Sequence, residues 1–366
     1  MTALTVRSPE ASAPGLRVQE DQAARPRAGR RGTRSWFAAA VVVGLVVLVV
    51  AERSVLASVW HALAGTQWRW LGAVLCAEVA SKAAVTRVHR RLLAAGGARL
   101  PFRSVLAVTY AGNAVSMTLP VVGAELAVAF SYRQFSRRGA SMASAGWTFL
   151  VSGVLATTAY ALLSAVGAAL TGTRWGLLLG VGGALAATVP GWVLVAILRR
   201  RAARQRLLGL VSRLLGHLPG RARRSGPATE ALVASAGEQL GALRLPRRDW
   251  AEVFLLAVVK WAVDALCLAA AIAAVGAPVP WSGLLLAYLA AAGVSSLAIT
   301  PGGLGTVELA LTTALVAAGL DVSHALAAAL VYRLVTLWLA TGVGWLLYAG
   351  LSTRVIQKVH TSGPAG

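Results

Sequence analysis

The sequence predicts an all-α, polytopic membrane protein, and three observations support this fold class. Hydrophobic residues make up 57% of the chain and charged residues only 13%, which is about half the charged share of a soluble domain. Uncharged runs at 139–173 and 175–198 exceed the roughly 20 residues that a helix needs to cross a bilayer. A Pro-Gly-Gly and an acid interrupt the apolar stretch 299–308. A broken helix at membrane depth must be buried in protein or line a cavity.

The N-terminal third begins on the cytoplasmic side. Residues 1–35 are rich in Ala, Pro and Arg without an apolar period, and they are predicted to form a disordered basic cytoplasmic tail. Seven arginines precede the first predicted span, 36–51, which places the N-terminus inside. The second span is predicted at about 70–86, and the arginines that follow it indicate a cytoplasmic loop.

The segment 104–132 is broken at Pro120-Val121-Val122-Gly123 and admits two interpretations. One kinked crossing would place the arginines of 133–138, and later the basic loop 199–249, outside. A re-entrant hairpin that enters from the cytoplasm keeps all of these arginines inside. The positive-inside rule therefore favours the hairpin.

The rest of the chain follows from that choice. A second hairpin, 284–320, is predicted to enter from outside and to turn at Pro301-Gly302-Gly303. The loop 199–249 is predicted to be cytoplasmic, either lying on anionic lipid or solvated, and 351–366 to be a cytoplasmic tail. Together these elements form a transmembrane domain, 36–350, in the plasma membrane with both termini cytoplasmic. Its eight apolar segments are two re-entrant hairpins and about six full spans, at 36–51, 70–86, 141–170, 175–198, 250–275 and 325–350.

The two halves of the domain have the same order: a span, a hairpin broken at proline, and a long span. The hairpins open to opposite sides, as in the inverted repeats of many secondary transporters. The span before each hairpin carries an acid–base pair one turn apart, Glu78 with Lys82 and Lys260 with Asp264. Such a pair either neutralises itself or marks a path or relay inside the membrane.

Two segments resemble a known family. Residues 297–308 and 329–338 are similar to the C-terminal half of the lysylphosphatidylglycerol synthase transmembrane (flippase-like) family. Gly112-Asn113, Leu119-Pro120 and Glu125 resemble the form seen in its actinobacterial members. The resemblance covers about 36–350. It implies the lipid-translocating membrane part of the family, without the soluble aminoacyl-transfer domain that the synthases carry.

Both hairpin turns deliver a helix N-terminus, near Ala124 and Thr306, whose free N–H groups and dipole favour an anion. Glu125 and Glu308, in the first turns of these helices, are expected either to cap the dipole or to act as a proton- or cation-coupled switch. We expect the two helix starts to approach each other and to line one polar cavity for a headgroup. The candidate translocation residues are Asn113, Pro120, Glu125, Arg133, Lys260, Asp264, Pro301, Gly302, Gly303, Gly305, Thr306, Glu308 and Arg333.

Three functions are compatible with the sequence. The first is translocation of an anionic, aminoacylated or polyprenyl-linked lipid, and the second is a membrane accessory or catalytic module for glycosyl or aminoacyl transfer to lipid. The third is a scaffold that transports nothing. An enzyme is not expected, because no catalytic constellation is found. No cofactor is predicted, and Cys76 and Cys267 lack metal-ligand spacing.

The expected partner is a membrane lipid of the anionic phospholipid or polyprenyl phosphate type. The net charge of +22 does not indicate nucleic acid, because the basic residues follow the positive-inside rule. A lipid-modifying enzyme or a second copy of the chain is a further possible partner. Gly176 and Gly180 form a small-xxx-small pair that could pack helices within or between protomers.

Overall fold

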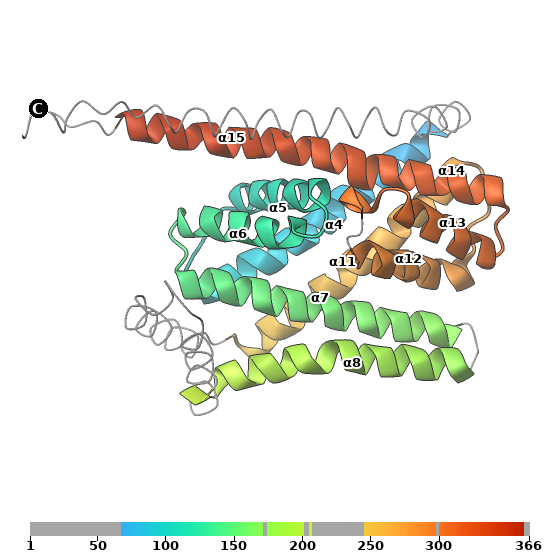
Figure 1. The fold of residues 1–366 in the computed structure, drawn as a ribbon, viewed down its shortest axis with the longest axis horizontal. Coiled ribbons are helices and arrows are strands. Elements are labelled where there is room, and N and C mark those ends of the chain that lie inside the picture. Colours follow the sequence, from blue (N-terminus) through green and yellow to red (C-terminus); the bar gives the residue numbers. More distant parts are fainter. Residues whose placement is uncertain (1–66, 171–173, 201–204, 207–244, 298–299, 362–366) are drawn as a thin grey trace, which may run out of the picture. The chain divides into compact units, whose positions relative to one another are not determined.

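The computed structural model describes residues 67–170, 174–200, 205–206, 245–297 and 300–361, all within one compact unit. The predicted tail 1–35, the first span 36–51 and most of the loop 199–249 lie outside the described residues. Every regular element in the described part is a helix, which confirms the all-α class (Figure 1). The elements are α4 (Trp68–Ala95), α5 (Phe102–Thr118), α6 (Gly123–Ser136), α7 (Met142–Leu170), α8 (Arg174–Arg199), α11 (Arg247–Ala274), α12 (Trp281–Ser296), η2 (Pro301–Gly303), α13 (Thr306–Ala317), α14 (Val322–Arg333), η3 (Leu334–Leu339) and α15 (Ala340–Thr361).

Three of the described helices are long and apolar enough to cross a membrane: α7, α11 and the continuous helix Val322–Ser352. The predicted spans 70–86 and 175–198 fall within α4 and α8. The arms of the second hairpin, Trp281–Ser296 and Pro301–Ala317, are shorter apolar helices. Both are below the roughly 20 residues that a full crossing requires, as a re-entrant hairpin predicts.

Hairpin 1 consists of α5, the turn 119–122 and α6. The two helices double back and pack against each other, so the alternative of one kinked crossing is wrong. Gly123 allows the tight closure, since a Cβ atom there would lie 2.4 Å from the Ser116 carbonyl oxygen. Val121 in the turn has a φ of 59°, a left-handed conformation that is strained for a β-branched residue.

Hairpin 2 consists of α12, η2 and α13, which also pack as antiparallel neighbours. Its turn is a short 3₁₀ segment that begins at Pro301. Gly302, Gly303 and Gly305 all have positive φ angles, between 60° and 75°. A side chain would strain each of these positions, so the Pro-Gly-Gly-x-Gly pattern fits this turn directly.

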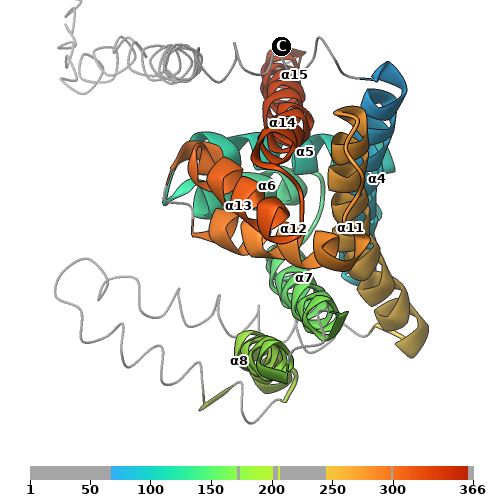
Figure 2. The same ribbon diagram turned by 90° about the vertical axis from the view of Figure 1, so that its right-hand side faces the viewer.

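The two halves repeat the same succession of elements. Helices α4 and α11 have 28 residues each, they run antiparallel side by side (Figure 2), and each is followed by a hairpin. Each hairpin also packs against the long helix of the other half, α5 on α15 and α12 on α7. The contact of α5 with α15 is close, because a Cβ atom on Gly344 would lie 2.4 Å from the Tyr110 carbonyl oxygen. This exchange ties the two halves into one body.

Candidate functional site

The tips of the two hairpins meet. A Cβ atom on Gly302 in η2 would lie 3.2 Å from the carbonyl oxygen of Met117, near the end of α5, and 2.7 Å from Leu337 Cδ1 in η3. The Trp345 indole of α15 donates a hydrogen bond of 3.0 Å to the Thr118 hydroxyl. The end of α5, the turn of hairpin 2 and the start of α15 therefore converge at one point, which we call the tip junction (Figure 1).

A buried ion pair holds the tip junction. Arg333 ends α14 and is 6% exposed. Its Nε donates to Glu308 Oε1 at 2.7 Å, and its Nη2 donates to the Gly302 carbonyl oxygen at 2.5 Å. The guanidinium thus ties α13 and the turn of hairpin 2 to the α14 helix. Arg333 leads directly into the π-helical segment η3, and π-turns occur frequently at functional sites.

The start of α13 keeps backbone donors available. Its N-cap, Gly305, provides no side-chain hydrogen bond. The Thr306 hydroxyl donates to the Gly303 carbonyl oxygen at 3.0 Å and so stabilises the turn instead. Glu308 is in the first turn, and its Oε2 atom is buried without a hydrogen-bond partner among the described residues. Glu308 therefore lies where it can offset the helix dipole, and it also serves as the counter-ion of Arg333.

A second group of charges lies between α4 and α11. Lys260 Nζ is 3.0 Å from Asp264 Oδ2, and Lys82 Nζ is 3.3 Å from Glu78 Oε1. The Tyr288 hydroxyl on α12 donates to Asp264 Oδ2 at 2.9 Å. Lys82 Nζ donates a long hydrogen bond of 3.4 Å to Asn113 Oδ1 on α5. We call Glu78, Lys82, Lys260 and Asp264 the charge quartet; it contacts both hairpins.

The predicted site residues are therefore divided. Pro301, Gly302, Gly303, Gly305, Thr306, Glu308 and Arg333 lie at the tip junction, and Asn113, Lys260 and Asp264 lie at the charge quartet. Pro120, Glu125 and Arg133 are exposed on hairpin 1, and Glu125 and Arg133 form no ion pair with any described residue. The structure thus brings Glu308 of hairpin 2 together with Arg333 of α14, and leaves Glu125 and Arg133 of hairpin 1 at the surface.

Sequence reasoning left several contributing residues off the candidate set. Glu78 and Lys82 were recognised as an acid–base pair, because charged residues are rare in an apolar span, but they were not included among the candidate residues. Tyr288 carries a hydroxyl within a run that is otherwise apolar, which is a weak signal for a buried hydrogen bond. Nothing in the sequence indicated a role for Trp345 or Met117, because their contacts depend on how the hairpins pack against each other.

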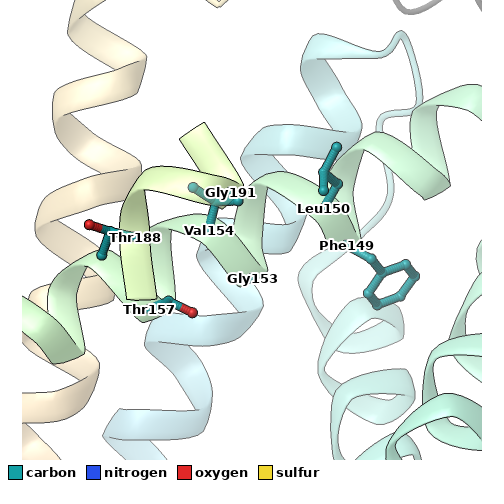
Figure 3. Close-up of a pocket in the computed structure, with 7 residues that line it drawn as sticks. All are labelled: Phe149, Leu150, Gly153, Val154, Thr157, Thr188 and Gly191. Carbon is teal, nitrogen blue, oxygen red and sulfur yellow. The ribbon is translucent and has the colours of Figure 1, made fainter. Parts of the chain in front are cut away.

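A separate cavity lies between α7 and α8, with a volume of 290 Å³. Figure 3 shows its lining, which comes from Phe149 to Thr157 on α7 and from Thr188 and Gly191 on α8. None of the candidate residues lines it. Within the described part of the chain, no group of three His, Cys, Asp or Glu side chains could hold a metal ion.

The helices, the paired hairpins and the buried ion pairs define a polytopic membrane protein with an internal repeat. The sequence also matches a known family of membrane proteins. The chain belongs to the family described as "Lysylphosphatidylglycerol synthase TM region", whose pattern matches residues 36–344. The predicted resemblance is thus confirmed over nearly the whole domain.

A curated archaeal protein is also similar. It is described as a "UPF0104 membrane protein" of Methanothermobacter thermautotrophicus, and it is 30% identical to this chain over 109 residues. The match covers 30% of this chain and 33% of the relative, so the chain spans about a third of the length of the curated protein that it matches.

Proposed function

We propose that this protein moves a lipid with an anionic headgroup between the two leaflets of the plasma membrane. The family assignment indicates a function connected with membrane lipids. The observation that carries the proposal is the tip junction, where two broken helices meet around a buried Arg333–Glu308 pair. Broken helices and buried charges at membrane depth mark substrate paths.

The proposed path uses the chemistry of an anion. A phosphate headgroup that reaches the start of α13 finds free backbone N–H groups at the positive end of the helix dipole. It also competes with Glu308 for the Arg333 guanidinium, which binds phosphate and carboxylate in the same way. When Arg333 leaves Glu308 and the Gly302 carbonyl oxygen, the turn of hairpin 2 loses its hold on α14. The tips of the hairpins then separate and let the headgroup pass.

The exposed charges of hairpin 1 provide the entry. Glu125 and Arg133 lie on α6, and the N-cap of this helix, Val122, makes no side-chain hydrogen bond. The free N–H groups at the start of α6 therefore offer a second anion site on the other half of the repeat. In this proposal the headgroup binds first at one hairpin and then at the other.

The proposal also includes the topology and the partners of the protein. Both termini lie in the cytoplasm, and a lipid-modifying enzyme or a second copy of the chain is the expected protein partner.

The test is lipid translocation by purified protein in liposomes that contain a fluorescent anionic phospholipid in both leaflets. Chemical quenching of the outer leaflet measures how fast inner lipid becomes accessible. Glu308→Gln removes the charge with little change in size. We expect it to abolish translocation, because Arg333 then has no counter-ion to displace the headgroup from it, and to lower the stability as well, since Arg333 stays buried without its charged partner.

Two outcomes would contradict this proposal. If the wild-type protein moves lipid no faster than liposomes without protein, translocation is not its function. If Glu308→Gln costs only about 0.3–1 kcal/mol of stability and translocation continues, Glu308 only offsets the helix dipole. Glu252→Gln is the matched control, because it removes the acid of the Arg91–Glu252 pair, which is partly exposed and far from the tip junction in sequence.

A further inference from the structure

The charge quartet lies between two antiparallel helices, α4 and α11. Three contacts fix how the residues of these helices are aligned. Gln67 N donates to the Ala274 carbonyl oxygen at 3.0 Å, and Cys267 Sγ donates to the Val74 carbonyl oxygen at 3.4 Å. Arg91 and Glu252 pair further along the same two helices. In this register Glu78 lies opposite Asp264, and Lys82 lies opposite Lys260. Each carboxylate pairs with the lysine on its own helix, and Asp264 interacts electrostatically with both Glu78 and Lys82 across the helix interface.

The two carboxylates of the charge quartet are held very differently. Asp264 accepts a hydrogen bond from Tyr288 and has Lys260 at 3.0 Å. Glu78 is 4% exposed, and among the described residues its Oε1 atom has only the longer ion pair with Lys82, at 3.3 Å. Glu78 thus has one charged partner and no hydroxyl donor, and it lies opposite a second carboxylate, so its anion has fewer stabilising contacts than that of Asp264. The titratable side chains that lie close enough to interact electrostatically with Glu78 are Lys82 on its own helix, Asp264, Lys260 and Cys267 on α11, Tyr110 on α5 and Tyr332 on α14.

We propose that Glu78 is a proton-binding site, and that a proton on Glu78 makes the charge quartet receptive to an anionic headgroup. The proton comes from water and adds to the carboxylate to give the neutral acid. With both acids ionised, the two negative and two positive charges of the quartet sum to zero. With Glu78 protonated, the quartet carries one net positive charge, and Lys82 loses its partner on α4.

The released Lys82 connects the proton to hairpin 1. Its hydrogen bond to Asn113 on α5 remains, and the Asn113 Nδ2 donor is buried without a partner in the described part of the chain. A lysine and an unpartnered amide donor on neighbouring helices form a suitable pair for a phosphate oxygen. Binding of the proton and binding of the anion therefore favour each other, since each offsets the charge of the other. This inference rests on the proposed function and adds proton coupling to it.

The first test measures the proton itself and needs no transport. Infrared difference spectra of the protein in lipid nanodiscs are recorded between about pH 8 and pH 6, where exposed carboxylates stay ionised. We expect the carbonyl band of a protonated acid to grow as the pH falls. Glu78→Gln should remove this band, and both Asp264→Asn and the surface control Glu252→Gln should keep it.

A double variant guards against misfolding. Glu78→Gln alone leaves the buried quartet with one unbalanced positive charge, whereas Glu78→Gln with Lys82→Gln keeps it neutral, and both should lack the band. A band that persists without Glu78, or that disappears only in Asp264→Asn, would overturn the assignment to Glu78. A spectrum without any such band in the wild-type protein would overturn the proton site altogether.

The second test asks whether the proton is coupled to lipid. A pH gradient across the liposomes should change the wild-type translocation rate, by up to about tenfold per pH unit for one coupled proton. The Glu78→Gln rate should not respond to the gradient. If the infrared band is present but no lipid moves, the proton site stands and the proposed function fails. If lipid moves at a rate that ignores the gradient in the wild type, the coupling fails and translocation stands.

Discussion

Replacing Gly302 by alanine should weaken the tip junction by an amount that the structure predicts. Gly302 has a φ of 60°, and an L-residue in this conformation costs about 1–2 kcal/mol. The added Cβ atom would also lie 2.7 Å from Leu337 Cδ1 and 3.2 Å from the Met117 carbonyl oxygen. Overpacking of this kind costs about 1–3 kcal/mol. The total is about 2–5 kcal/mol of unfolding free energy, measured by detergent denaturation of the purified protein.

Gly305→Ala separates the two contributions. Gly305 has a similar φ of 75°, but a Cβ atom there would meet nothing within 4 Å. Gly305→Ala should therefore lose only the backbone part, about 1–3 kcal/mol, because its ψ of −46° lies outside the left-handed helical region. Adding Leu337→Ala to Gly302→Ala should relieve the closest clash and recover part of the difference between the two alanine variants. If Leu337→Ala costs as much stability in the Gly302→Ala background as it does alone, there is no clash to relieve, and the packing of this turn at the tip junction would be refuted.

Three further predictions concern the ion pair, the hydrogen bond between α11 and α12, and the topology. Arg333→Met should destabilise the protein by about 3–5 kcal/mol, because it leaves Glu308 without its charged partner. Adding Glu308→Gln should recover most of that loss. A loss of the same size in the double variant would contradict the ion pair. Tyr288→Phe should cost about 1–2 kcal/mol by removing the hydrogen bond to Asp264, without altering the infrared band assigned above, and an unchanged denaturation midpoint would argue against the bond. Cysteine at position 137, after hairpin 1, should be labelled by impermeant reagents only from the cytoplasmic side, and labelling only from outside would exclude the hairpin topology.

The sequence predicted the hairpins well because their signals are local. Pro301 and the glycines that follow it interrupt a long apolar run, and the structure has a turn with positive φ angles there. Pro120 marked the first turn in the same way. The acid–base spacing also predicted that Lys260 and Asp264 pair on one helix, as they do at 3.0 Å.

The partners across the fold could not be predicted in this way. Arg333 and Glu308 lie on different helices, and their contact depends on how hairpin 2 packs against α14. Glu125 occupies a similar position on hairpin 1, yet it is exposed. The rotation of a short helix such as α6 is fixed by tertiary packing, so its sequence does not tell which side faces inward. The π-helical segment Leu334–Leu339 was not predicted either, because it too depends on tertiary packing.

The central claim is that the hairpin tips separate when lipid passes. Thr118 at the tip of hairpin 1 and Trp345 on α15 are joined by a hydrogen bond of 3.0 Å at the tip junction. Cysteines at these two positions, in a background where Cys76 and Cys267 are alanine, are linked by a short bifunctional methanethiosulfonate whose disulfides are cleaved by reduction. Translocation of a fluorescent anionic phospholipid is then measured with the pair cross-linked and again after reduction. The account predicts that the cross-link stops translocation and that reduction restores it, and a cross-linked protein that moves lipid at the reduced rate would contradict it.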